Sequence, residues 1–387
     1  MTGTRQPNAR GIAAMALCAG KIHIPDCDQR AFVQDLAYTA AKRKRALDAV
    51  IKALVARKPG KTAMALLEIG AAQLLYMDGV PDFAAVGETV EAAKTLCGSK
   101  TASFVNGVLR NIARNREALV AKHVSAASLA VRESHPDAII EKWTARFGET
   151  AAETLAKLDN EPAQTFLARP DGTFTPLERG RRVDETDGYA EGKFIVQDPA
   201  TAASIALLDP REGESVLDAC AAPGGKTIQC AWRGAGVAAC EPDGKRRERL
   251  AENIARTRLE GKVRIFAAPP EGESFDKALV DAPCSNSGVF RRRPDARWNW
   301  SMEKVAELCA VQAQILDDAA SRVRPGGTLV YSTCSIEPEE NAHQCAAFLE
   351  RHGDWTFLRS REILPHIDGC DGAFAALFAK KDAKDGQ

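Results

Sequence analysis

From Lys193 onward, short apolar runs alternate with helical stretches, and this alternation limits the possible folds more than any other feature. The runs have the length of buried strands. They are Ser215–Leu217, Val237–Ala239, Val263–Phe266, Lys277–Val280 and Thr328–Tyr331. Alternation of this kind is typical of a doubly wound, Rossmann-like α/β fold with a parallel sheet. A late apolar run, Gly372–Ala379, is expected to pair at or near the sheet edge.

Two cysteines follow two of these runs directly. Cys284 stands in Asp281-Ala-Pro-Cys-Ser and Cys334 in Tyr331-Ser-Thr-Cys-Ser. If both strands belong to one parallel sheet, both thiols emerge at its carboxyl edge, where open α/β sheets bind ligands. A lone cysteine is more often a small buried hydrophobic residue than a catalyst. Two at one sheet edge indicate a covalent adduct that is both made and broken.

The N-terminal third has a helical pattern instead. Apolar residues recur there at steps of three and four around polar stretches such as Lys42–Arg45, which is typical of packed amphipathic helices. We predict an all-helical domain over residues 1–130, a helical connector and small linker subdomain over 131–192, and the sheet domain over 193–387.

The net charge of zero hides an asymmetry between these parts. Residues 1–130 hold 18 Lys and Arg against 10 Asp and Glu, a net charge of +8, so the remainder carries −8. A basic domain can attract nucleic acid. A solvated helical surface would give the same count, so charge alone leaves both interpretations open.

Composition excludes several classes of protein. The sequence contains no apolar run of about 18 residues, the length that a membrane span needs, and it opens without a secretory signal pattern. The eleven cysteines are spread singly, with no Cys-x-x-Cys pair, which argues against a disulfide framework and against a zinc site. We therefore expect a cytoplasmic protein without a metal and without membrane association. We also expect a monomer, although composition does not determine the oligomeric state.

A glycine-containing loop follows the first strand of the sheet domain. It consists of Cys220, Ala221, Ala222, Pro223, Gly224, Gly225 and Lys226. A phosphate-binding P-loop would need a glycine where Cys220 stands, and the dinucleotide fingerprint Gly-x-Gly-x-x-Gly is absent. S-adenosyl-L-methionine remains as the ligand, because Glu241 after the next strand is placed to hold ribose hydroxyls. A surface carboxylate at a loop start is the alternative for Glu241 alone.

Several motifs together resemble the NOL1/NOP2/Sun family of RNA 5-methylcytosine methyltransferases. They are Cys220–Lys226, Asp281–Ser285, Arg292–Asp295, Tyr331–Ser335, Pro338–Asn341 and Asp371–Phe374. The helical domain resembles the NusB-like RNA-binding fold through Ala65–Tyr76, Val86–Ala93 and Phe104–Arg110. The resemblance implies methylation of a cytosine C5 in RNA, with small-subunit (16S) rRNA as the expected partner.

The resemblance also assigns roles to particular residues. Carbon 5 of cytosine is a poor nucleophile, and addition of a thiolate to carbon 6 turns the ring into a reactive enamine. The family pattern implies Cys334 as that nucleophile, Asp281 as the carboxyl near N3 of the base, and Cys284 as the residue that helps release the product. Asp281 is also expected at the cofactor. For Lys226 we favour contact within the cofactor loop over a catalytic role.

Two further sequence features concern the binding of the cofactor and of RNA. Family members commonly carry an acidic residue after the third strand to bind the adenine amino group, where this chain has Ala268. One missing charged hydrogen bond weakens binding by about 1.5–3 kcal/mol. A stretch of basic and aromatic residues has the side chains that bind RNA phosphates and bases. The alternative is an exposed loop with one anchored tryptophan. The members of this stretch are Arg291, Arg292, Arg293, Arg297, Trp298 and Trp300.

Other functions remain open at this point. The same chemistry could act on a different RNA, because the helical domain specifies no nucleotide sequence. A non-catalytic RNA-binding ribosome assembly factor is a second alternative, motivated by Ala268. Methylation of an exocyclic amino group is less favoured, because such enzymes prefer an aromatic residue where this chain has Cys284.

Overall fold

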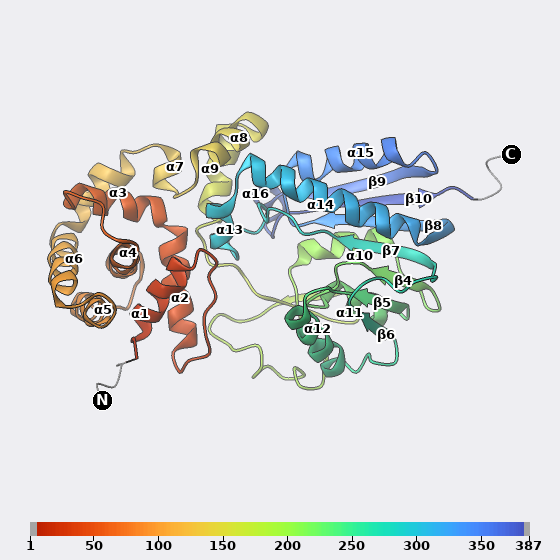
Figure 1. The fold of residues 1–387 in the computed structure, drawn as a ribbon, viewed down its shortest axis with the longest axis horizontal. Coiled ribbons are helices and arrows are strands. Elements are labelled where there is room, and N and C mark those ends of the chain that lie inside the picture. Colours follow the sequence, from red (N-terminus) through yellow and green to blue (C-terminus); the bar gives the residue numbers. More distant parts are fainter. Residues whose placement is uncertain (1–5, 383–387) are drawn as a thin grey trace. The chain divides into compact units, whose positions relative to one another are not determined.

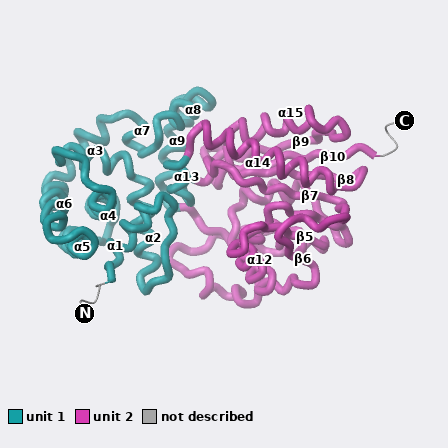
Figure 2. The backbone as a smooth tube through the Cα atoms, in the orientation of Figure 1, with its two compact units in different colours: residues 1–162, 290–299 teal, residues 163–289, 300–387 magenta. Residues whose placement is uncertain are grey.

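The computed structural model describes residues 6–382, and Figure 2 shows its division into two units. The helical unit comprises Met1–Pro162 and Phe290–Asn299, and the sheet unit comprises Ala163–Val289 and Trp300–Gln387. Residues 1–5 and 383–387, at the outer ends of the predicted ranges 1–130 and 193–387, lie outside the described residues.

The helical unit follows the three- and four-residue periodicity of its sequence. Its helices are α1 (Ala9–Cys18), α2 (Arg30–Lys42), α3 (Lys44–Leu54), α4 (Lys61–Tyr76), α5 (Asp82–Cys97), α6 (Ser99–Val120), the π-helical turn η1 (Ala121–Ser125), α7 (Leu129–Arg132), α8 (Asp137–Phe147), α9 (Glu149–Leu158) and α13 (Pro294–Asn299). Helix α4 is buried along most of its length and contacts α1, α2, α5 and α6. Leu66 and Leu67 of α4 are fully buried. The core of this unit is therefore built around α4.

Segment Phe290–Asn299 belongs to the helical unit although it lies far away in the sequence. Arg297 is fully buried and donates hydrogen bonds to the backbone oxygens of Ser134 (3.0 Å) and Asp159 (3.2 Å), among others. Nε1 of Trp298 donates to the Ala41 oxygen at 2.7 Å. The expectation that Arg297 pairs with RNA phosphates is wrong, because its guanidinium is enclosed by carbonyl groups of its own chain.

The sheet unit contains the alternating strands and helices that the sequence predicts. Its large-sheet strands are β4 (Ser215–Asp218), β5 (Gly236–Cys240), β6 (Val263–Phe266), β7 (Phe275–Asp281), β8 (Val323–Thr333), β9 (Trp355–Ile363) and β10 (Ala373–Lys380). Its helices are α10 (Ala202–Leu208), α11 (Gly225–Trp232), α12 (Gly244–Arg256), α14 (Met302–Ser321), α15 (Ala342–Arg351) and α16 (Pro365–Asp368), with short turns η2 (Pro199–Thr201) and η3 (Pro338–Glu340). The strand order is β6-β5-β4-β7-β8-β10-β9.

The strands from β4 to β8 pair in parallel, and only β10 runs antiparallel to its neighbours β8 and β9. One hydrophobic cluster packs α10, α11 and α12 on one face of the sheet, and a second packs α14 and α15 on the other. Figure 1 shows these two helix layers with the sheet between them. The predicted fold class, a doubly wound sheet preceded by a helical domain, is confirmed.

Strand β9 was not predicted from the sequence. It forms the edge of the sheet, so β10 lies one strand further in. Residues Thr356–Glu362 of β9 are exposed on both faces, and their polar and apolar residues do not alternate. An edge strand held mainly by backbone hydrogen bonds leaves little hydrophobic pattern to detect.

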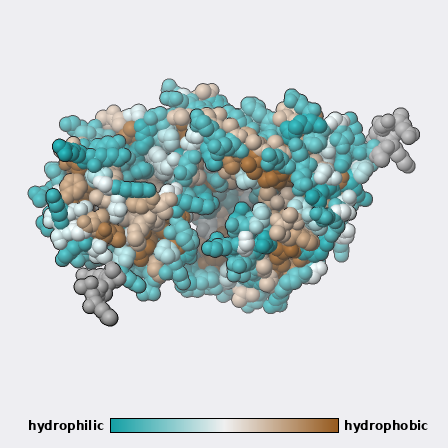
Figure 3. Space-filling model, in the orientation of Figure 1, coloured by the Kyte–Doolittle hydropathy of each residue, from teal (hydrophilic) through white to brown (hydrophobic). Residues whose placement is uncertain are grey.

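A small antiparallel sheet of order β2-β1-β3 precedes the large one. It consists of β1 (Phe166–Ala168), β2 (Phe174–Pro176) and β3 (Ile195–Val196), packed around Leu167, Leu177 and Phe194. Among the described residues, no helix is long and apolar enough to span a membrane. On the face drawn in Figure 3, hydrophilic residues cover most of the surface and apolar residues lie in small groups.

Replacing Arg297 by Met should destabilise the helical unit by about 3–5 kcal/mol. The substitution leaves several buried carbonyl oxygens without their donor, while the hydrophobic area changes little. Urea unfolding followed by far-ultraviolet circular dichroism measures this loss. The control is Arg293→Met, because Arg293 is exposed and its ion pair with Asp295 spans 3.6 Å. Equal unfolding curves for Arg297→Met and Arg293→Met would show that the buried guanidinium is not a structural anchor.

Candidate active site

The two cysteine-bearing loops leave the sheet at the same edge. Strands β7 and β8 pair in parallel, with Asp281 opposite Ser332 at their carboxyl ends. The chain beyond each strand places the Cys284 and Cys334 sulfurs 3.2 Å apart. The sequence prediction that both thiols meet at one sheet edge is therefore confirmed.

Close backbone approach keeps these loops together. The Gly288 nitrogen donates to the Cys334 oxygen at 3.0 Å, and the Gly372 nitrogen donates to the Gly288 oxygen at 2.8 Å. A Cβ at residue 288 would lie 2.8 Å from the Cys334 oxygen and equally close to backbone atoms of Gly372. A side chain at position 288 would thus force the cysteine loops apart.

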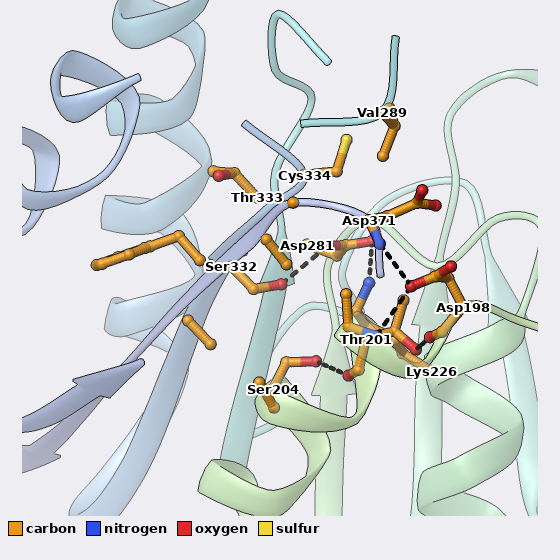
Figure 4. Close-up of a pocket in the computed structure, with 16 residues that line it drawn as sticks. Asp198, Thr201, Ser204, Lys226, Asp281, Val289, Ser332, Thr333, Cys334 and Asp371 are labelled. Carbon is orange, nitrogen blue, oxygen red and sulfur yellow. Dashed lines mark hydrogen bonds and ion pairs between the residues drawn. The ribbon is translucent and has the colours of Figure 1, made fainter. Parts of the chain in front are cut away.

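A pocket opens beside one thiol and not the other. Sixteen residues line the pocket in Figure 4, and they come from β7, β8, β10, the segment of η2 and α10, the start of α11 and the loops beside them. Cys334, Asp281 and Lys226 are among them, whereas Cys284 is absent from this lining and only 8% exposed. The Cys334 sulfur is therefore the one that a ligand in this pocket can reach.

The two thiols also differ in their electrostatic environment. The hydrogen bond with Cys334 and burial raise the pKa of Cys284 well above its ordinary value. Cys284 thus keeps its proton at neutral pH and can donate it toward the Cys334 sulfur. The Asn286 side-chain oxygen lies 3.4 Å from that sulfur. These contacts hold the Cys334 sulfur between two polar partners.

Asp281 is held by two neighbours at the pocket wall. Its Oδ2 lies 2.6 Å from Nζ of Lys226, and its Oδ1 accepts a hydrogen bond from Ser332 at 2.8 Å. Burial lowers the pKa of Lys226, but the Asp281 carboxylate outweighs this effect and raises that pKa overall. Lys226 is therefore a fixed cation in the pocket wall, next to the carboxylate that the sequence singled out.

The glycine loop connects β4 to α11 as predicted. Gly224 has φ +110°, which residues with a side chain rarely adopt, and a Cβ there would lie 2.9 Å from Leu250. Asn253 donates to the Pro223 oxygen at 2.9 Å and Arg246 to the Ala222 oxygen at 3.0 Å. The loop is thus pinned by α12, with the N-terminus of α11 following it.

Asp218, at the end of β4, holds this loop through side-chain hydrogen bonds. Its side chain accepts hydrogen bonds from Thr227 Oγ1 at 2.6 Å and from the Cys220 nitrogen at 3.4 Å. Burial raises the pKa of Asp218 to about 6, although the Thr227 hydrogen bond opposes this shift. Cys220 and Ala221 leave the strand here, and the Ala221 nitrogen donates to the Cys240 oxygen at 2.9 Å.

Glu241 stands directly after β5, as the sequence predicts for a ribose ligand. Its side chain is almost fully buried, accepts a hydrogen bond from the Asp243 nitrogen at 3.0 Å, and pairs with Arg246 at 3.2 Å. Ala268 lies two residues beyond β6 and is exposed. The acidic residue expected after that strand is therefore absent in the structure as in the sequence.

Several residues of the site had no role in the sequence prediction. Asp198 and Asp371 line the pocket, and Asp198 Oδ1 accepts hydrogen bonds from the nitrogens of Ala200 (3.0 Å) and Asp371 (3.1 Å). Asp198 caps η2, and the Asp-Pro pair at its start is a local signal for such a cap. Asn286 and Glu340 contact residues that lie far away in the sequence, and no local pattern predicts such contacts.

Comparison with known proteins agrees with this architecture. The family model described as 16S rRNA methyltransferase RsmB/F matches residues 205–379, and the NusB family model matches residues 10–114. The ribosomal RNA small subunit methyltransferases B of Erwinia tasmaniensis and Vibrio cholerae are 33% and 35% identical to this chain. Both comparisons cover 91% of this chain, with 90% and 89% of the relatives.

The solved structure of the protein PH0851 has a TM-score of 0.80. It covers 97% of this chain and all of its own at 24% identity, which shows a common fold. The identity and coverage of the two relatives carry the assignment further, and they confirm the resemblance inferred from the motifs. The chain therefore belongs to the 16S rRNA methyltransferase RsmB/F family and carries a NusB family domain ahead of its methyltransferase sheet.

Proposed function

We propose that the protein transfers a methyl group from S-adenosyl-L-methionine to C5 of a cytosine in RNA, through a covalent bond between Cys334 and C6 of the base. The observation that carries this proposal is the unequal placement of two adjoining thiols. Cys334 lines the pocket, while Cys284 lies 3.2 Å from it and is buried.

The residues of the cofactor loop fit the proposed methyl donor. Gly224 leaves the backbone accessible where the loop turns into α11, and the buried Glu241 stands at the end of the neighbouring strand. Glu241 would accept hydrogen bonds from the ribose hydroxyls, and the loop Cys220–Lys226 would line the remainder of the donor. S-adenosyl-L-methionine supplies an electrophilic methyl group when bound.

The pocket groups account for attack on the base. The Cys334 thiolate adds to C6 of the cytosine, which moves electron density toward C5 and N3. We assign Asp281 to N3 of the base, where a proton shared between its carboxyl group and N3 would offset the developing charge. Its contacts with Lys226 and Ser332, which fix its two oxygens, support this assignment. With S-adenosyl-L-methionine bound, the activated C5 would take its methyl group as the methyl–sulfur bond breaks, and S-adenosyl-L-homocysteine would leave.

Cys284 supports the release step. Once solvent water has taken the C5 proton, the C5–C6 double bond re-forms and the C6–sulfur bond breaks, which returns Cys334 as a thiolate. The protonated Cys284 thiol can donate a hydrogen bond to that departing sulfur across 3.2 Å. Burial and the Cys334 contact keep this proton in place by raising the pKa of Cys284.

The proposed substrate is 16S rRNA in the cytoplasm. Two relatives that cover nearly the whole chain are named ribosomal RNA small subunit methyltransferase B. The positive charge of residues 1–130 supports RNA attraction by this part of the chain. The same methylation on another RNA is the alternative within this chemistry. A non-catalytic assembly factor is favoured only by Ala268.

The two cysteines should fail in different ways. Cys334→Ala should abolish methyl transfer, because the base then has no nucleophile. Cys284→Ala should still transfer one methyl group but accumulate a protein–RNA adduct, visible as a shifted band on a denaturing gel. Cys97→Ala, in the helical unit, is the matched control and should behave as wild type. An adduct trapped by Cys334→Ala would instead reverse the two assignments.

Glu241 should govern affinity for the methyl donor. Glu241→Gln should weaken S-adenosyl-L-methionine binding by about 10- to 150-fold, because a charged hydrogen-bond acceptor is worth about 1.5–3 kcal/mol. Isothermal titration calorimetry measures the change, and the exposed Glu248→Gln is the control. No detectable heat from the wild-type protein at millimolar donor would favour the assembly factor.

Bisulfite sequencing of 16S rRNA should identify the target. RNA from cells that lack the gene should lose one protected cytosine, and expression of the wild-type gene should restore it. The Cys334→Ala gene should not. Unchanged protection throughout 16S rRNA would transfer the proposal to a different RNA.

A further inference from the structure

A buried turn at the start of α15 touches both cysteine-bearing loops. It consists of η3 (Pro338–Glu340) and the following residue Asn341, and the side chains of Glu340 and Asn341 are 0% and 1% exposed. The chemistry proposed above uses neither side chain. Their hydrogen bonds nevertheless end on the immediate neighbours of Cys284 and Cys334.

Glu340 holds the loop that carries Cys284. Its Oε1 accepts a hydrogen bond from the Ser285 nitrogen at 2.8 Å, and its Oε2 accepts one from Ser285 Oγ at 2.5 Å. Gln312 of α14 also donates to Oε1 at 3.0 Å, and the same Gln312 amide donates to the Pro283 oxygen at 2.9 Å. The Glu340 carboxylate and its partner Gln312 thus bind the residues on both sides of Cys284.

Asn341 holds the loop that carries Cys334 in the same way. Its side-chain oxygen accepts a hydrogen bond from Thr333 Oγ1 at 2.7 Å, and its Nδ2 donates to the Ser335 oxygen at 2.9 Å. Thr333 and Ser335 flank Cys334 in the chain. Both residues around this second cysteine are therefore bonded to one amide.

The two loops share further contacts where the cysteines lie. Backbone hydrogen bonds join them at Ala282, whose nitrogen donates to Ser332 at 2.9 Å, and again at Gly288. Between these points the contacts run through side chains, including Ser285 Oγ and Ser335 Oγ at 3.2 Å. The position of each thiol therefore depends on side chains that bind its loop as well as on these backbone bonds.

We infer that Glu340 and Asn341 are positioning residues that set the separation of the Cys284 and Cys334 thiols. Because they are adjacent in one short turn, a single rigid piece of backbone fixes both loops at once. Glu340 orients the thiol assigned to release, and Asn341 the thiol assigned to attack. The catalytic consequences rest on the proposed function, whereas the thiol separation does not.

A role in fold stability alone does not account for this arrangement. A buried carboxylate is costly to desolvate, and well-packed apolar residues often stabilise a core as well or better. Tyr331 already ties the turn to the sheet, since its hydroxyl donates to the Glu340 backbone oxygen at 2.6 Å. The carboxylate adds contacts that end beside Cys284.

The separation of the thiols can be measured without RNA or methyl donor. Diamide oxidises two adjoining thiols to a disulfide, accepting their two electrons and two protons as it becomes a hydrazine. The wild-type sulfurs need to close from 3.2 Å to about 2 Å. Glu340→Ala should form the Cys284–Cys334 disulfide at least tenfold more slowly, as measured by mass spectrometry of peptides after alkylation.

Glu340→Gln is the decisive companion variant. The new amide oxygen can accept hydrogen bonds from the Ser285 nitrogen and from Gln312, and the amide nitrogen can donate one to Ser285 Oγ. The Cys284–Cys334 disulfide should therefore form in this variant at least as fast as in the wild type. The Glu340 charge helps to raise the pKa of Cys284. Loss of that charge alone would therefore speed oxidation, and slowing in Glu340→Ala reports lost geometry. Glu350→Ala, exposed on α15, is the control.

The kinetic assay separates the two halves of the turn. Glu340→Ala should retain a first methyl transfer, lose about 100-fold in steady-state turnover and accumulate the RNA adduct, since a displacement of about 1 Å can cost that factor. Asn341→Ala should lower the first transfer itself and accumulate no adduct. Glu340→Gln should restore turnover to near the wild-type rate.

The outcomes distinguish this inference from the proposed function. The positioning role would be overturned if folded Glu340→Ala formed the disulfide at the wild-type rate. It would also be overturned if Glu340→Gln formed the disulfide as slowly as Glu340→Ala. If Glu340→Ala does not fold, Ser285→Ala removes one of its hydrogen bonds, and an unchanged bridging rate there would overturn the role too. If Glu340→Ala forms the disulfide slowly but the wild-type protein methylates no cytosine C5, the thiol-positioning role would be supported and the proposed function rejected.

Discussion

The parallel pairing of β7 with β8 is the interaction on which the site depends. Its register places Asp281 opposite Ser332, so the residues three positions beyond Asp281 and two beyond Ser332 become Cys284 and Cys334. A shift of one residue would turn the side chains at the strand ends to the opposite face. The strand register thus determines which chemical groups share the pocket.

Environment gives two identical thiols different properties at this edge. Cys284 is enclosed, and its contact with Cys334, its burial and the nearby Glu340 carboxylate all raise its pKa. Cys334 lines the pocket beside the Lys226–Asp281 pair. The enclosed thiol and the thiol in the pocket wall are thus suited to different steps of a reaction. The turn that fixes the loops also carries a charge that adds to the rise in the Cys284 pKa.

Local pattern was enough to predict the large features of the fold and part of the site. The alternation of strands and helices, the loop from Cys220 to Lys226 and the meeting of Cys284 with Cys334 all follow from residues close together in sequence or from one strand pairing. Glu340 belongs to one of the family motifs, but its role leaves no local pattern, because its partner Ser285 lies 55 residues away. Long-range side-chain contacts of this kind leave no periodic signal. Arg297 misled the prediction because a buried arginine and a surface arginine look alike in sequence.

The loop that carries Cys284 also explains why the two units cannot be divided at one point in the sequence. Gly288 lies against the Cys334 backbone, and two residues later the chain enters Phe290–Asn299, which folds as part of the helical unit. Trp143 of α8 packs against Phe290 with ring centroids 6.1 Å apart, and the hydrogen bonds of Arg297 fix the end of the segment. These contacts fix Phe290–Asn299 within the core of the helical unit. Arg297 thus joins distant segments within the helical unit by donating to their carbonyl oxygens, as the buried Glu340 carboxylate joins distant segments within the sheet unit by accepting from Ser285 and Gln312.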